Sequence, residues 1–265
     1  MMPVLLWTDA LIFMLAAVVT GFIIYARGKP HLRTPWYRVF KGRIAAASVV
    51  VLLAFVVVGL LDSLHFRLQL ENNGNNETTH YAVDVLSVLD VILDPVRTQV
   101  EKTYSAPFAT RLFAKETIER EDGTQVRDYP RLQYGGRHLP ASGEGRGQDI
   151  LQRSLLALAE ALLAGAIILY ATALLLGRRS GRSSRRMVQL ILAGETVLPW
   201  RTIVVTGTLL LLLVFLAINL ASAYHVLGTD KVGQDVFYQS LKSIRTGLLI
   251  GTLTTLIMLP FAVFM

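Results

Sequence analysis

The stretch Thr202–Ala221, TIVVTGTLLLLLVFLAINLA, runs for twenty residues without a charged side chain. An α-helix rises about 1.5 Å per residue, so a helix of this length covers the roughly 30 Å hydrocarbon core of a bilayer. Inside lipid every backbone N–H and C=O group must be bonded within the protein, and a helix satisfies them all. The stretch therefore predicts a transmembrane α-helix and an all-α membrane protein.

Four further apolar runs have a similar length, which gives about five transmembrane helices in all. The whole chain is 53% hydrophobic and only 17% charged, whereas about a quarter of the residues of a soluble domain are charged. No basic residue precedes the first apolar run, and the acidic residue Asp9 lies near its start, so we expect a retained helix rather than a cleaved signal peptide. The four runs are residues 5–26, 44–61, about 155–176 and 246–265.

The charges between these runs predict the orientation of the chain in the membrane. Residues 27–43 carry six basic residues and no acid, and residues 178–201 carry six basic residues and one acid. Residues 62–152 carry 10 basic and 14 acidic residues. Basic loops stay in the cytoplasm, so the N-terminus, residues 62–152 and residues 223–245 are expected outside. This distribution accounts for the net charge of +7 through anionic lipid headgroups, and no nucleic-acid partner is expected.

The long outer segment, residues 62–152, is expected to pack on the helices, because its own core would be thin. It begins with the polar linker 71–80 and continues with a helix that Pro95 should end or kink. Asp122-Gly123 is typical of a hairpin turn. The apolar positions at helical spacing are Val85, Leu86, Leu89, Ile92 and Leu93.

Residues 183–202 lead into the fourth run and place Met187, Leu190 and Ile191 on one apolar face beside a basic cluster, with Leu198 as a further candidate for that face. This pattern favours a helix that lies on anionic lipid. A docking surface for a cytoplasmic partner is the alternative interpretation.

We find no residue pattern for catalysis, metal binding or cofactor binding. The chain has no cysteine, which excludes disulfides and thiolate chemistry. Its histidines are scattered and are interpreted as surface or loop residues. Asp9 and Glu160 are acids within or beside apolar runs, where each either belongs to an ion path or reaches the interface. The histidines are His31, His65, His80, His138 and His225.

Residues 225–251, HVLGTDKVGQDVFYQSLKSIRTGLLIG, contain the most detailed polar pattern of the chain. Gly228 allows a tight turn, and Thr229 or Asp230 would cap a helix that starts there. The predicted helix is amphipathic and lies at the outer surface, with Arg245 near headgroups or an acidic neighbour. Small residues then recur every four positions, which permits close helix packing. The apolar stripe is Phe237, Leu241, Ile244 and Leu248, and the small residues are Gly247, Gly251 and Thr255.

This stretch resembles the signature segment of the permease subunits of dipeptide/oligopeptide ABC transporters of the DppC/OppC type. Val226 stands where that pattern has proline, and Gln234 stands where it has arginine. Residues 35–64 resemble the N-terminal region of the same family, in which a basic aromatic segment precedes a helix. The matching residues are His225, Leu227, Gly228, Thr229, Asp230, Gly233, Asp235, Val236 and Arg245.

The resemblance implies a permease component of a bacterial inner-membrane importer for peptides or similar small solutes. It implies a second permease subunit, a pair of cytoplasmic ATPases that use ATP and Mg²⁺, and an extracytoplasmic solute-binding protein. No cofactor is expected in this chain itself. Residues 228–245 would form part of the outer gate or of the contact with the binding protein.

The chain departs from the family by extra helices and by the lack of the cytoplasmic segment that couples to the ATPase. We therefore expect a fragment or one part of a split permease. The alternative is a non-transporting sensing or assembly protein, and the sequence does not name the solute. The expected parts are a helix pair (1–61), an outer segment (62–152), a second helix pair (153–222), the signature segment (223–245) and the start of the permease core (246–265).

Overall fold

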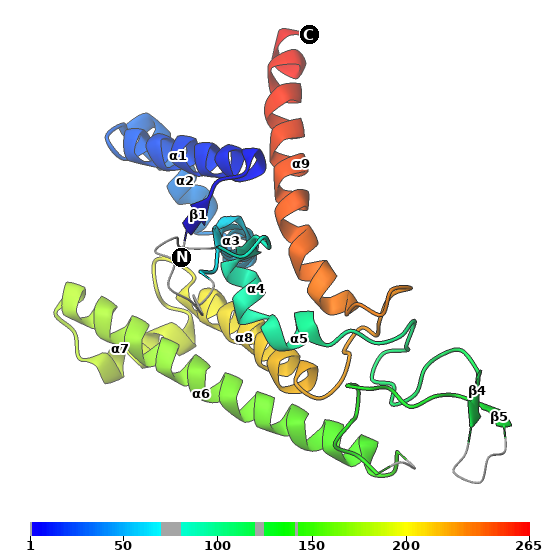
Figure 1. Cartoon of the computed structure of the whole chain (residues 1–265). Coiled ribbons are helices and arrows are strands. Elements are labelled where there is room, and N and C mark those ends of the chain that lie inside the picture. The colour runs from blue at the N-terminus through cyan, green and yellow to red at the C-terminus, as the bar shows by residue number, and fades with distance from the viewer. Residues whose placement is uncertain (1, 70–80, 120–124, 141–142) are drawn as a thin grey trace, which may run out of the picture. The chain divides into compact units, whose positions relative to one another are not determined.

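The computed structural model describes residues 2–69, 81–119, 125–140 and 143–265 (Figure 1). Over these residues the protein is mostly helical, as expected. The chain divides into two compact units, each built from segments distant in sequence. Unit 1 comprises Met1–Arg33, Leu53–Arg97 and Tyr238–Met265, and unit 2 comprises Thr34–Leu52 and Thr98–Phe237.

Five helices among the described residues are long and apolar enough to cross a membrane. Most of their side-chain surface is exposed on the isolated chain. So much exposed apolar surface is unfavourable in water, and it is what lipid or neighbouring membrane helices cover. The prediction of about five helices long and apolar enough to span a membrane is thereby confirmed, and it is consistent with a membrane protein. The helices are α1 (Trp7–Arg27), α3 (Arg43–Ser63), α6 (Arg146–Ser180), α8 (Trp200–Ala221) and α9 (Val236–Phe264).

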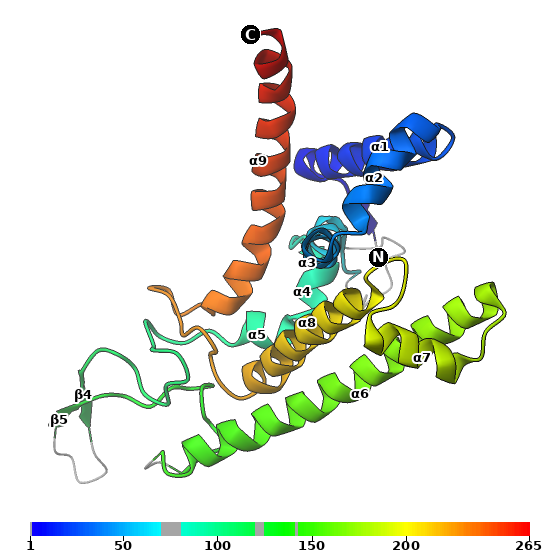
Figure 2. The ribbon, with the colours of Figure 1, turned by 180° about the vertical axis from the view of Figure 1, so that it is seen from behind.

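In unit 2, helices α6 and α8 lie side by side in antiparallel orientation (Figures 1 and 2). Gly165 of α6 permits the close approach, since an added Cβ there would lie 2.6 Å from the methyl carbon of Thr208. Asn219 of α8 donates a hydrogen bond of 2.8 Å to Glu160. The carboxylate of Glu160 is thus bonded to the neighbouring helix.

Helix α7 (Ser184–Ala193) packs on α6, which corrects the expectation of a helix whose apolar face lies on lipid. Met187 and Ile191 are buried against Ala173 of α6. Leu190 is partly buried against the same cluster. The apolar face that the sequence reveals is therefore covered by the protein's own helix.

Unit 1 contains α1, the C-terminal part of α3, most of α9 and a small antiparallel sheet in the order β1-β2-β3. The helix expected from Val85 begins later, because Leu86 and Ser87 pair with β2 and Ser87 caps the helix at Val88. Pro95 lies in the first turn of the next helix, where a proline is tolerated. The elements are β1 (Met2–Val4), β2 (His65–Arg67), β3 (Leu86–Ser87), α4 (Val88–Ile92) and α5 (Asp94–Thr98).

The strands correct the all-α prediction, although they are short. In unit 2, β4 (Glu116–Glu119) pairs in antiparallel fashion with β5 (Gln125–Asp128). This pairing fits the predicted hairpin, while its tip at 122–123 and the linker 71–80 lie outside the described residues. Helix α2 (Pro30–Phe40) occupies most of the basic segment between α1 and α3.

Helix α9 corrects the prediction for the signature segment. It begins at Val236 rather than after Thr229 or Asp230, and it continues without a break to Phe264. Gly233, with φ +79°, prevents an earlier start, because a left-handed residue cannot continue an α-helix. The amphipathic residues 237–245 are therefore the first turns of a long helix and form no separate surface helix.

Candidate functional site

The loop of residues 225–235, called here the 225–235 loop, lies in unit 2 against residues 101–108. Gly228 and Gly233 have φ values of +77° and +79°. A Cβ on Gly228 would overlap the carbonyl oxygen of Ser105, and one on Gly233 would overlap that of Glu101. Glycine is required at both positions by conformation and by space together.

His225 is the buried centre of this loop and lies between two buried carboxylates. Its Nδ1 is 2.7 Å from Asp235, and its Nε2 is 3.3 Å from Glu101. Burial alone would lower the pKa of His225, but the hydrogen bonds to Asp235 and Glu101 outweigh it and raise the pKa to about 9. His225 is therefore an imidazolium at neutral pH, with both ring nitrogens donating.

Glu101 joins this loop to a second one. It accepts hydrogen bonds from the backbone amides of residues 133, 134 and 135 as well as from His225. Burial alone would raise its pKa, but the hydrogen bond with His225 and these amides lower the pKa of Glu101 to about 2. A carboxylate so fully bonded stays ionised and fixes the position of both loops.

The remaining polar residues of the loop bond to its own backbone and to residues 103–105. Thr229 donates to the carbonyl of Thr103 at 2.8 Å. Asp230 accepts hydrogen bonds from the amides of Val232 and Gln234, which closes the turn. Asp235 accepts from the amide of Phe237 at 2.8 Å, so Asp235 is the residue that caps α9.

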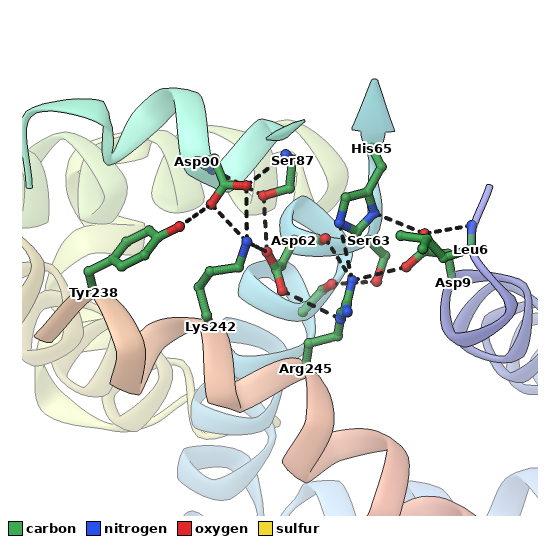
Figure 3. A network of polar contacts seen from close by, with 11 residues as sticks. Leu6, Asp9, Asp62, Ser63, His65, Ser87, Asp90, Tyr238, Lys242 and Arg245 are labelled. Carbon is green, nitrogen blue, oxygen red and sulfur yellow. Dashed lines mark hydrogen bonds and ion pairs between the residues drawn. The ribbon is translucent and has the colours of Figure 1, made fainter. Parts of the chain in front are cut away.

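A second polar group lies in unit 1 and is called here the Arg245 cluster (Figure 3). Arg245 of α9 donates to Asp9 of α1 at 3.1 Å, and its Nε lies 3.4 Å from Asp62 at the end of α3. Asp9 and Asp62 are both fully buried. The three helices are thus joined by ion pairs whose carboxylates are fully buried, while the Arg245 side chain keeps 19% of its surface exposed. The cluster consists of Asp9, Asp62, His65, Ser87, Asp90, Tyr238, Lys242 and Arg245.

Lys242, one turn before Arg245, carries the second cation of the cluster. Its Nζ lies 2.8 Å from Asp90 of α4 and 3.2 Å from Asp62. Tyr238 also donates to Asp90, at 2.6 Å. Burial alone would raise the pKa of Asp90, but the bonds from Lys242, Tyr238 and the amide of Ser87 lower the pKa to about 2.

His65 connects the two ends of the Asp9–Arg245 pair. Its Nδ1 lies 2.9 Å from Asp9, and its Nε2 lies 3.3 Å from Nη1 of Arg245. A guanidinium only donates, so Nε2 must accept and the proton must be on Nδ1. The cluster thus holds three carboxylates together with Lys242 and Arg245, and His65 connects Asp9 to Arg245.

The predicted helix-packing residues do not perform that role within the described part of the chain. A Cβ added to Gly247 or Gly251 would meet no atom within 4 Å, and Thr255 is exposed. The close approach to α9 is made instead by Gly59 of α3, where an added Cβ would lie 2.8 Å from Leu248. The small-residue spacing on α9 thus faces away from the helices of unit 1.

The structure brings together most of the matched residues but divides them between two sites. His225, Gly228, Thr229, Asp230, Gly233 and Asp235 form the 225–235 loop, and Arg245 belongs to the other cluster. Leu227 remains 47% exposed. His65 and His225 are not surface side chains, since both are buried. His225 does lie in a loop, as predicted, whereas His65 lies in β2.

Four further members of these ion pairs were not predicted from the sequence: Asp62, Asp90, Glu101 and Lys242. Two sequence positions could have indicated these ion pairs. Asp62 stands at the end of an apolar run, and Lys242 lies one turn before Arg245. Among the described residues no His, Asp and Glu side chains are grouped to hold a metal ion. Both sites are arranged to fix helix ends and loops, since their buried charges are paired and hydrogen-bonded.

No protein-family model matches this chain, and comparisons with curated proteins and with solved structures also find no match.

Proposed function

We propose that this chain is a permease component of an ABC importer for peptides or similar small solutes. The chain lines or supports the pathway in a bacterial inner membrane, beside a second permease subunit. Separate ATPase subunits supply the energy, and an extracytoplasmic binding protein delivers the solute. The N-terminus, residues 62–152 and the 225–235 loop lie outside.

The observation that carries this proposal is the role of the matched residues in the fold. Gly228 and Gly233 have no room for a side chain. His225 and Asp235 form a buried ion pair, and Arg245 bonds two buried carboxylates. A chance match would fall on tolerant and intolerant positions alike, whereas these five matches fall where another residue would disrupt the fold; Leu227, which also matches, is exposed and tolerates change.

The two departures from the family pattern fall at positions that tolerate change. Gln234 has an exposed side chain, and Val226 is only partly buried. The loop contacts residues 101–105 through its glycines and its buried charges, and neither Val226 nor Gln234 is one of these. The pattern of matches and departures thus supports a shared loop structure, and through it the transport function.

The experiment that tests this proposal is purification of the tagged chain from its native membrane. We expect an ATPase subunit with a phosphate-binding P-loop to remain bound in a fixed ratio, and ATP hydrolysis by the preparation. Gly233→Ala, which should disrupt the 225–235 loop, provides a matched variant. Purification of a well-folded chain without any ATPase would favour the sensing or assembly role and contradict the proposal.

A further inference from the structure

A cavity of about 450 Å³ in unit 2 lies where helices α3 and α8 begin. Lys41 and Arg43 line it from the start of α3, and Arg201 lines it from the first turn of α8. The segment between α7 and α8 closes it through Gly194 and Thr196. Both helices are candidate membrane spans, so a cavity at their first residues would lie at a membrane surface.

Within the part of the chain that the structure describes, the positive charges of this cavity have no acidic partner. Among the described residues, Lys41, Arg43 and Arg201 form no ion pair, whereas the basic residues of the Arg245 cluster each bond a carboxylate. Three cations around one concave site repel one another, and a bound anion would remove that repulsion.

The start of α8, whose residues Pro199, Arg201 and Thr202 line the cavity, has backbone donors that no side chain caps. Pro199 is the N-cap, and no side chain caps the helix or places an acid in its first turn. Over the described residues the amides of Arg201 and Thr202 have no hydrogen-bond acceptor. Uncapped amides and the positive end of the helix dipole favour an anion with several acceptor oxygens.

We propose that this cavity binds a phosphate group, contributed either by an anionic lipid headgroup or by free phosphate. Arg43 and Arg201 provide guanidinium groups that can contact two phosphate oxygens each, and Lys41 adds a compact charge. The position at the ends of two spans favours the lipid source, since a headgroup phosphate lies at this depth. This site is independent of the transport proposal.

The experiment measures the thermal stability of the purified full chain in neutral detergent micelles. Phosphatidylglycerol, phosphatidylcholine or inorganic phosphate is added at matched ionic strength. We expect phosphatidylglycerol to raise Tm in a saturable manner and phosphatidylcholine to leave it unchanged. The double variant Arg43→Gln with Arg201→Gln should bind phosphatidylglycerol roughly thirtyfold more weakly.

The matched control is Arg178→Gln with Arg185→Gln, which removes the same charge from exposed positions outside the cavity. It should keep the affinity of the unaltered chain. A rise in Tm with inorganic phosphate as well would identify a site for the free ion, and a rise with the lipid alone would identify the headgroup. The proposal would be overturned if the two double variants lost the same affinity for phosphatidylglycerol, or if neither phosphatidylglycerol nor inorganic phosphate raised Tm.

Discussion

Gly233→Ala is expected to cost about 3 kcal/mol or more of the free energy of unfolding, because two penalties act together. The residue has a φ of +79°, and an added Cβ would overlap the backbone of Glu101. Glu101 cannot move away cheaply, since it holds His225 and three amides of the neighbouring loop. Titration with denaturing detergent, followed by tryptophan fluorescence, measures the loss.

Two other glycines of unit 2 separate the contributions. Gly181→Ala has the same backbone penalty at φ +66° but meets no atom within 4 Å, so it should cost only about 1 kcal/mol. Gly207→Ala, inside α8 and also unobstructed, should be neutral or slightly stabilising. If Gly233→Ala were no worse than Gly181→Ala, the close packing of the loop on Glu101 would be wrong.

Arg245→Ala is the second variant with a large expected effect. It removes the cation that faces Asp9 and Asp62, both fully buried, which leaves Asp9 without a lysine or arginine partner and Asp62 with Lys242 alone. Breaking a buried ion pair from one side typically costs about 3–5 kcal/mol. The same detergent titration should show a loss of this size, together with weaker attachment of α1.

Arg111→Ala is the control for this variant, because its pair with Asp128 is about half exposed on both sides. An exposed pair of this kind contributes at most about 1 kcal/mol. Arg245→Lys keeps the charge but cannot bond Asp9 and Asp62 through separate nitrogens, so it should fall between the two. Equal effects of Arg245→Ala and Arg111→Ala would mean that the cluster does not join the helices.

Hydropathy alone located the spans, because an uncharged run of about twenty residues has few other stable structures. The start of α9 was missed for a local reason. Thr229, Asp230 and Asp235 are all good N-cap residues, and sequence does not show that Gly233 is left-handed and that Asp235 caps. The apolar face of α7 was predicted, but its packing on α6 was not, because an apolar stripe has the same sequence pattern whether lipid or another helix covers it.

The charged partners could not be predicted, since they are distant in the chain. Arg245 bonds residues 236 and 183 positions away, and Glu101 lies 124 positions from His225. From the sequence, the partner of Arg245 could be either lipid headgroups or an acidic neighbour, and the structure shows acidic neighbours. Only a three-dimensional arrangement reveals which carboxylates become buried with which cations.

The most direct test of the transport proposal is ATP-dependent uptake of radiolabelled di- and tripeptides by cells with and without this chain. Leu227, 47% exposed on the 225–235 loop, can be changed to Asp with little effect on folding, and Val83→Asp, at an 88% exposed position outside the signature, is the control. We predict chain-dependent uptake that Leu227→Asp lowers several-fold and Val83→Asp leaves intact. Uptake that is the same without the chain, or unaffected by Leu227→Asp, would contradict the account.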